Sequence, residues 1–375
     1  MTGLAGLATP CALVELERVE RNTERMAERA HALGVRLRPH VKTHKTAELA
    51  RLQVRGHFGG VTVSTVAEAR AMAAAGLRDI TYAVPLAPEL LGRLAELARG
   101  LERLSLLIDH PDAASWIEER ARADGRPIPV YLKLDCGAGR AGVDPERGES
   151  LRLAARLARS PHVEFRGLLT HAGQAYRCRT RDAIRAEADR ERDVPLRFAR
   201  RLREDGVEVP DISIGSTPTA MVAADLAGIG EIRPGNYVFF DAFQAAIGSC
   251  SLDECAFTVL ATVIGRHPER NTLVINAGAL ALSKDAGPTH VDPACGFGRV
   301  FSEDGTRLFD GLRVESLTQE HGLVRSRGPL GAAHPLGSRL RIIPNHSCLA
   351  AAQHDRYHVV RGNEIVAEWR PARGW

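Results

Sequence analysis

The chain has no long hydrophobic run. None of its 375 residues lies in a stretch that approaches the ~18–20 consecutive apolar residues of a transmembrane helix, although the hydrophobic share of 44% suffices for a globular core. Residues 1–22 also lack a basic segment followed by a long apolar one, which is the pattern of a secretory signal peptide. We therefore expect a protein without a signal peptide and without a membrane partner.

Aromatic residues, charge of one sign and patterned cysteines are also scarce. Only 5% of the residues are aromatic, and the net charge of +4 comes from acids and bases interspersed along the chain. A nucleic-acid-binding surface would concentrate Lys and Arg in a patch with aromatic residues, so we expect no nucleic-acid partner. The seven cysteines form an odd, widely spaced set, which is typical of reduced thiols and predicts a cytoplasmic location.

What is present, first of all, is an alternation of short apolar runs with longer amphipathic segments in residues 14–245. The eight apolar runs are VRLRPHV, GGVTVST, ITYAVPL, LSLLID, PVYLKLD, FRGLLTHA, DISIGST and EIRPGNYVFF. Between most of them lie helical patterns, one of which begins with a capping box formed by Thr65 and Glu68. This count predicts an α/β protein with a (β/α)8 TIM-type barrel. A doubly wound sheet is the alternative, but no GxGxxG motif follows the first strand.

The pattern changes in residues 246–375. Segments such as AFTVLATVIGRH and YHVVRGNEIVAEW are rich in β-branched residues and separated by turn residues, while long helical patterns vanish. We expect a second, mostly β domain here, to which residues 1–13 add a strand. Asp241 and Gln244, just before this domain, either line a pocket or cap the next helix.

Two glycine-containing turns end the seventh and eighth predicted strands, at residues 214–219 and 233–237. Barrel enzymes carry their catalytic groups at the C-terminal ends of the strands and often bind phosphate with the last two loops. Either turn alone is uninformative, but the two together at the expected strand ends favour a phosphate site.

A lysine, Lys42, follows the first predicted strand in the segment Arg38–Thr46. Burial and the neighbouring bases His40, His44 and Lys45 would lower the pKa of its amine, as a Schiff-base lysine requires. The alternative is a surface loop rich in basic residues. A lysine at the barrel mouth and a phosphate site opposite it are the minimum groups that a protein needs to bind pyridoxal phosphate (PLP).

The segment Pro39–Lys45 resembles the Schiff-base segment of the D-serine dehydratase and D-threonine aldolase family, PLP enzymes of fold type III related to alanine racemase. The resemblance continues in order along nearly the whole chain, through residues 133–142, 170–173, 215–219, 233–237, 319–322 and 344–348. Any one match is weak, whereas the ordered set is specific.

The resemblance implies a role for each matching residue. Lys42 would form the Schiff base and act as the base at the substrate α-carbon, Arg140 would contact the phenolic oxygen of PLP, and His171 would stack on its ring. Tyr176 would approach the ring nitrogen. The phosphate would be held by Ser216, Thr217, Gly235 and Asn236.

His346 and Cys348 decide between the reactions of this family. By itself an H-x-C pair is weak evidence for a metal, but the resemblance implies that these two residues bind a divalent metal near the 3-hydroxyl of the substrate. A cysteine ligand favours Zn²⁺ over the harder Mn²⁺ or Mg²⁺. In the family that the chain resembles, dehydratases carry His and Cys at these positions and many aldolases carry His and Asp. The resemblance therefore implies a dehydratase that converts D-serine to pyruvate and ammonia, with the metal assisting the departure of hydroxide.

Other functions remain open. The nearest alternative is a D-threonine or D-3-hydroxyaspartate aldolase, which would release glycine and an aldehyde from the same site. A racemase is disfavoured, because racemases of the related family use a tyrosine of the β domain as a second base. The only tyrosine after residue 245, Tyr357, lies in no motif that matches theirs. A non-catalytic PLP-binding protein is the alternative from another class. Gln174 departs from the histidine expected in dehydratases, and the resemblance also implies a homodimer.

Overall fold

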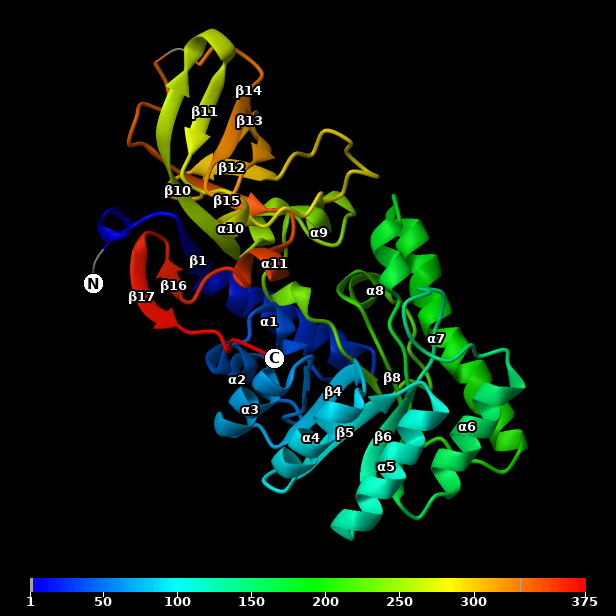
Figure 1. The fold of residues 1–375 in the computed structure, drawn as a ribbon. Helices are drawn as coiled ribbons and strands as arrows, with labels where there is room; N and C mark the ends of the chain where they lie inside the picture. The colour runs from blue at the N-terminus through cyan, green and yellow to red at the C-terminus, as the bar shows by residue number, and fades with distance from the viewer. Residues whose placement is uncertain (1–2, 331) are drawn as a thin grey trace. The chain divides into compact units, whose positions relative to one another are not determined.

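The structure, a computed structural model, describes residues 3–330 and 332–375 and divides into two compact units. One unit comprises residues 25–235 together with 372–375, and the other comprises the residues up to 24 together with 236–371. The two units are described separately, as the barrel unit and the β unit, and can be followed by colour in Figure 1.

The barrel unit contains eight parallel strands in the order β2-β9-β8-β7-β6-β5-β4-β3. Their bounds are Arg36–Leu37 (β2), Val61–Val63 (β3), Asp79–Pro85 (β4), Arg103–Ile108 (β5), Ile128–Lys133 (β6), Val163–Leu169 (β7), Ile212–Ile214 (β8) and Glu231–Ile232 (β9). The sheet closes where His40, just after β2, bridges to Thr62 on β3. The predicted (β/α)8 barrel is therefore confirmed, with all eight strands in the predicted places.

Amphipathic helices cover the outside of this barrel. They are α1 (Leu16–Ala32), α2 (Ala47–Gln53), α3 (Val66–Ala74), α4 (Leu91–Ala98), α5 (Pro111–Asp124), α6 (Gly148–Arg159), α7 (Arg181–Glu204) and α8 (Thr217–Val222). Helix α4 packs on β5, α5 on β6 and β7, and α7 on β7 and β8 (Figure 1). The Thr65 hydroxyl caps α3 as predicted, but the Glu68 carboxylate accepts from the N–H of Ser64, one residue earlier than a capping box requires.

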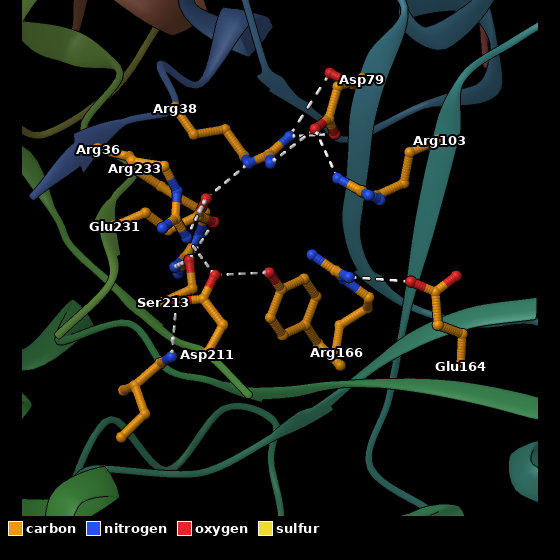
Figure 2. Close-up of polar contacts among 12 residues, drawn as sticks. Arg36, Arg38, Asp79, Arg103, Glu164, Arg166, Asp211, Ser213, Glu231 and Arg233 are labelled. Carbon is orange, nitrogen blue, oxygen red and sulfur yellow. Dashed lines mark hydrogen bonds and ion pairs between the residues drawn. The ribbon is translucent and has the colours of Figure 1, made fainter. Parts of the chain in front are cut away.

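The interior of the barrel is ionic where its shortest strands meet, as Figure 2 shows. Arg38 donates from Nε to Glu231 on β9 at 2.9 Å and from a terminal nitrogen to Asp79 on β4 at 2.7 Å. The second carboxylate oxygen of Glu231 accepts from the hydroxyl of Ser213 on β8 at 2.5 Å. Burial raises the pKa of Glu231, but Arg38 and Ser213 outweigh this and hold it below its usual value. Side chains therefore join strands that share few backbone hydrogen bonds.

The β unit is built on a nine-stranded sheet in the order β11-β14-β13-β12-β15-β10-β1-β16-β17. The bounds are Cys11–Glu15 (β1), Phe257–His267 (β10), Thr272–Ile275 (β11), Gly298–Ser302 (β12), Leu308–Leu317 (β13), Gly322–Ser326 (β14), Arg339–Pro344 (β15), Tyr357–Arg361 (β16) and Glu364–Trp369 (β17). Strand β10 pairs with both β15 and β11, so six antiparallel strands close into a second barrel. Strand β1 extends it by pairing with β10 and β16.

Short helices connect the strands of the β unit, namely α9 (Ala242–Ala246), α10 (Ala279–Leu282) and α11 (Ser347–Ala351). A 3-10 turn at residues 236–238 overlaps the turn that was predicted at residues 233–237, at the end of the eighth barrel strand. Within residues 3–330 and 332–375, no helix has both the length and the apolar composition that crossing a bilayer requires.

Replacing Glu231 by Gln should lower the free energy of unfolding by about 3–5 kcal/mol, because it leaves the buried Arg38 guanidinium with one anionic partner instead of two. Urea unfolding followed by circular dichroism measures this. Glu149→Gln, at an exposed position on α6, should change the free energy by less than about 0.5 kcal/mol. If Glu231→Gln lowered the free energy of unfolding as little as Glu149→Gln, the contacts of Arg38 and Ser213 with Glu231 would not be what stabilises the barrel.

Candidate active site

Lys42 lies on a 3-10 turn, Val41–Thr43, at the C-terminal end of the first barrel strand. Val41 and Thr43 on either side of it are buried, whereas the Lys42 side chain is exposed. The turn is preceded by His40, whose backbone closes the barrel. The fold therefore fixes the backbone of Lys42 firmly and leaves its side chain at the mouth of the barrel.

The bases around Lys42 are arranged differently from the sequence-based expectation. His44 is fully buried, accepts at Nδ1 from the N–H of Thr46 at 3.1 Å and donates at Nε2 to Gln53 at 2.9 Å. Burial lowers the pKa of His44 to about 4. Lys45 forms an ion pair with Glu68 at 3.0 Å. The expectation that His44 is a cation beside Lys42 was wrong, because a buried imidazole with two neutral partners stays unprotonated.

Two neutral histidines flank the lysine. Burial, with the nearby charges of Lys42 and Arg233, holds the pKa of His40 well below its usual range, and burial with Lys42 does the same for His171. His171 lies just after β7 and donates from Nδ1 to the carbonyl of Gly215 at 2.9 Å. A neutral ring that donates at Nδ1 keeps an unprotonated Nε2. The barrel unit thus brings His171 near Lys42, as predicted for a shared site.

The two predicted phosphate loops lie at the ends of β8 and β9. Ser216 precedes α8 as its N-cap and Thr217 is the first residue of that helix, and both are buried. Gly235 lies so close to the turn of Lys42 that a Cβ there would come within 2.8 Å of the carbonyl oxygen of His40. Only glycine allows this approach, so the β9 loop and the lysine turn share one side of the barrel mouth.

Arg140 lies at the tip of the loop after β6. The carboxylate of Asp135 accepts from three successive N–H groups of this loop, those of Gly137, Ala138 and Gly139, at 2.8–2.9 Å. The Arg140 side chain itself is exposed, and its charge is close enough to lower the pKa of His171 further. Asp135 therefore shapes the loop that presents Arg140.

Tyr176 lies on the 3-10 turn Gly173–Arg177 that follows His171, and it is half-buried. On the same turn, the Gln174 amide donates to the carbonyl of Cys136 at 3.1 Å and to Glu187 at 2.8 Å. The glutamine that stands in place of the expected histidine therefore joins the loops after β6 and β7.

The proposed metal ligands lie in the β unit, at the junction between β15 and α11. His346 has extended backbone angles and Cys348 lies in the first turn of the helix, so the backbone changes conformation between them. Residues two apart in a continuous strand lie on one face, whereas here the pair spans the change from extended to helical backbone, so the strand period does not by itself fix how the two side chains lie. His346 donates from Nδ1 to Asp285 at 3.1 Å.

Electrostatics couple the two candidate ligands. Burial lowers the pKa of His346, but hydrogen bonds to Asp285 and Cys348 outweigh it and raise that pKa to about 11. The same hydrogen bond is the largest factor that lowers the pKa of Asp285. A histidine held at Nδ1 by a carboxylate presents Nε2 to a metal, which is the usual arrangement in metalloproteins. Among residues 3–330 and 332–375, however, no three His, Cys, Asp or Glu side chains are grouped as a complete metal site.

Asn236, predicted to bind phosphate, faces the proposed metal segment with its side-chain nitrogen. That nitrogen donates to Asp241 at 2.8 Å and to the hydroxyl of Ser347 at 2.9 Å, and lies 3.6 Å from the sulfur of Cys348. Asp241 caps α9 through the N–H of Gln244 and also accepts from the N–H of Ser347 at 3.0 Å. The capping alternative for Asp241 was therefore right, with a second role in holding Ser347 between the two candidate ligands.

Sequence reasoning missed three polar residues behind these loops. Lys133, on the inner side of β6, has its pKa lowered to about 8 by burial, Arg233 and Arg140. Glu191 is fully buried on α7, and Asp285 lies in a loop far from His346 in sequence. Glu191 had a detectable signal, because it occupies an apolar-face position of α7 in the series Ile184, Ala188, Glu191, Pro195, Phe198 and Leu202.

Comparison with known proteins gives two family matches. Residues 14–242 match the family "Alanine racemase, N-terminal domain", and residues 256–360 match the family "Putative serine dehydratase domain". The first match covers more than half of the chain.

Three curated relatives match over nearly their whole lengths. D-threo-3-hydroxyaspartate dehydratase from Delftia sp. is 39% identical over 99% of both chains. D-serine dehydratase from Dictyostelium discoideum is 35% identical over 98% of both chains. D-threonine aldolase from Arthrobacter sp. is 32% identical over 99% of this chain and 94% of its own.

Solved structures agree with these matches. The structure of D-threo-3-hydroxyaspartate dehydratase from Delftia sp. HT23 aligns with a TM-score of 0.95 at 38% identity, over 100% of both chains. A cysteine-to-alanine variant of D-threo-3-hydroxyaspartate dehydratase, described as the metal-free form, aligns with a TM-score of 0.94 over 100% of both chains. An alanine racemase from Clostridium difficile 630, at 15% identity and a TM-score of 0.70, shares the fold.

A neutral, buried His44 predicts a pH dependence of stability. Its pKa is 6.5 in the unfolded chain and about 4 in the folded one, so its stabilisation is fully present above pH 6.5 and is lost as the pH falls toward 4. The loss amounts to up to about 3 kcal/mol. Urea unfolding at several pH values should show a smaller decline between pH 6.5 and 4 for His44→Asn than for the wild type. Equal declines would show that His44 is protonated in the folded protein.

Proposed function

We propose that this chain, which belongs to the family of D-serine dehydratases and D-threonine aldolases, removes the 3-hydroxyl group of a D-3-hydroxy amino acid and releases a keto acid and ammonia. The relatives are PLP-dependent lyases, and this chain is a lyase of that kind. We take D-serine as the substrate, with pyruvate and ammonia as products. The observation that carries the dehydratase assignment is the His346–Cys348 pair, whose histidine is oriented by Asp285.

The residues at the barrel mouth fit PLP. The close approach of Gly235 to His40 leaves the β9 loop without a side chain next to the turn of Lys42. Buried hydroxyls from Ser216 and Thr217 lie at the end of β8, which suits a phosphate group. The neutral ring of His171 is held in one orientation by Gly215.

In the proposed mechanism Lys42 would hold the cofactor and would accept the α-proton of the substrate at Nζ. When bound, PLP supplies an electron sink for the negative charge that develops at the α-carbon. Arg140 would place a positive charge at the phenolic oxygen of the cofactor, and Tyr176 would approach the ring nitrogen. Ser216, Thr217, Gly235 and Asn236 would bind the phosphate, with Asn236 contributing its backbone N–H because its side-chain nitrogen donates to Asp241.

We propose that His346 and Cys348 bind a divalent metal, Zn²⁺ in preference to Mn²⁺ or Mg²⁺. An imidazole and a thiolate form a donor set that zinc prefers. The metal would supply Lewis acidity for the departure of hydroxide. Support comes from two solved variants of D-threo-3-hydroxyaspartate dehydratase. One replaces a histidine by alanine, and the other replaces a cysteine two positions later and is described as the metal-free form. His346 and Cys348 have the same spacing.

The substrate has a second candidate, D-threo-3-hydroxyaspartate. The observation that favours it is the 39% identity, over 99% of both chains, to a dehydratase of that compound. Retro-aldol cleavage of D-threonine or D-3-hydroxyaspartate is the alternative reaction, because a relative of 32% identity is an aldolase. We also propose a homodimer by family resemblance, and a cytoplasmic location because all seven cysteines are free thiols.

The products formed by the purified protein test the function. With PLP and Zn²⁺ supplied, D-serine should give pyruvate and ammonia without glycine, and D-threo-3-hydroxyaspartate should give a keto acid rather than glycine. Lys42→Ala should abolish both reactions, since the protein loses the group that accepts the α-proton. Glycine and an aldehyde as products would make the protein an aldolase. If neither reaction occurs in the wild type, the lyase assignment itself is contradicted.

The role of Asp285 can be tested on metal binding alone. Asp285→Ala should weaken Zn²⁺ affinity about 10–100-fold, because the His346 ring loses the carboxylate that orients it. Competition with a chromophoric chelator measures the affinity without any turnover. Asp310→Ala, at an exposed position of the same unit, serves as the control and should leave the affinity unchanged. Equal affinities for the two variants would contradict the metal assignment of His346.

A further inference from the structure

A single buried carboxylate on α7 collects three hydrogen bonds from two loops of the barrel mouth. One oxygen of Glu191 accepts from the N–H of Ala172 at 2.6 Å and from the N–H of Gly215 at 3.1 Å. The other accepts from the hydroxyl of Thr219 at 2.6 Å. Glu191 is 1% exposed, so these donors, and not water, satisfy its charge.

The three donors belong to the segments that carry the proposed cofactor ligands. Ala172 directly follows His171 in the loop after β7, and Gly215 directly precedes Ser216 in the loop after β8. The two loops also meet through the bond from His171 to the Gly215 carbonyl. Glu191 therefore holds the two loops at a fixed separation from behind.

The Thr219 hydroxyl connects Glu191 to Ser216 through hydrogen bonds. Its hydroxyl oxygen accepts from the N–H of Ser216 at 3.1 Å and lies 2.9 Å from the Ser216 hydroxyl oxygen. A carboxylate can only accept, so the one proton of the Thr219 hydroxyl points to Glu191. Thr219 is thereby left with its lone pairs facing Ser216, which fixes the direction of the hydrogen bonds at this loop.

The surroundings of Glu191 combine burial, three hydrogen bonds and the nearby positive charge of the buried Arg233. Burial raises the pKa of Glu191, while the hydrogen bonds from Thr219, Ala172 and Gly215 oppose that rise. An anion behind a phosphate-binding loop repels the phosphate, and this repulsion is strong in a buried site. Arg233 offsets part of this charge, and the three hydrogen bonds give the carboxylate a geometric role at the loops.

We infer that Glu191 is a positioning residue for the cofactor phosphate, acting through Gly215 and Thr219 on Ser216 and Thr217. The inference rests on the proposed PLP site. It assigns to α7 a part in cofactor binding, although no residue of that helix is proposed to touch the cofactor.

The test measures cofactor binding rather than turnover. Glu191→Gln keeps the size of the side chain but presents an NH2 group to one set of donors, leaving buried donors unsatisfied. Titration of the cofactor-free protein with PLP, followed by absorbance, should show an affinity about 10–100-fold weaker than that of the wild type. Asp189→Asn, an exposed change on the same helix, removes the same charge and should leave the affinity within about twofold.

The direction of the change in PLP affinity distinguishes a geometric role of Glu191 from a purely electrostatic one. If Glu191 acted only through its charge, its removal would tighten PLP binding. The phosphate-free analogue pyridoxal provides a second probe, and its affinity should fall less than that of PLP in Glu191→Gln. Equal or tighter PLP binding by the variant, or equal losses for PLP and pyridoxal, would overturn the inference. Failure of the wild type to bind PLP would instead contradict the proposed function.

A milder variant covers the case in which Glu191→Gln does not fold. Thr219→Val removes the hydroxyl that joins Glu191 to Ser216 and leaves the bonds from the backbone N–H groups of Ala172 and Gly215 to Glu191 in place. It should weaken PLP binding in the same direction but by less, about three- to tenfold, because the backbone donors of Ala172 and Gly215 keep their acceptor. Unchanged PLP affinity in a folded Thr219→Val protein would contradict the link from Glu191 to the phosphate loop.

Discussion

The ion pair between Arg38 and Glu231 holds the barrel together where its backbone pairing is weakest. Strands β2 and β9 have two residues each, and β8 has three, so few ladder hydrogen bonds join them. Arg38 reaches Glu231 on β9 and Asp79 on β4, and Ser213 on β8 bonds to the same glutamate. The turn of Lys42 and both proposed phosphate loops follow directly from these short strands.

Several functional loops are held by a carboxylate that takes no proposed part in the chemistry. Asp135 shapes the loop of Arg140, and Glu191 holds the loops that carry His171 and Ser216. In the β unit, Asp241 accepts from the N–H of Ser347, and Asp285 orients His346. Because carboxylates accept several hydrogen bonds at once, one side chain can fix several backbone donors. The loops that carry the proposed ligands are thereby fixed by side chains other than the ligands themselves.

The sequence was sufficient for the barrel, because eight apolar runs separated by helical patterns leave few other architectures. The sequence also predicted a cofactor site at Lys42, because basic residues surround this lysine and glycine-containing turns end the last two strands. It could not show that His44 is neutral, since burial by Gln53 and Thr46 depends on how α2 packs. It gave no hint of Asp285, because the contact with His346 spans sixty-one positions. The turn at residues 233–237 was predicted, but the hydrogen bond from Asn236 to Asp241 that accompanies it was not.

Borohydride reduction of the PLP-loaded protein, followed by peptide mass spectrometry, tests the central claim most directly. The chain has four lysines, of which Lys45 is paired with Glu68, Lys133 is buried in the barrel and Lys284 lies in the β unit. The account predicts that the reduced cofactor is attached to the peptide containing Lys42 and to no other. Attachment to Lys133, whose lowered pKa makes it the strongest competitor, or to no lysine at all, would contradict it.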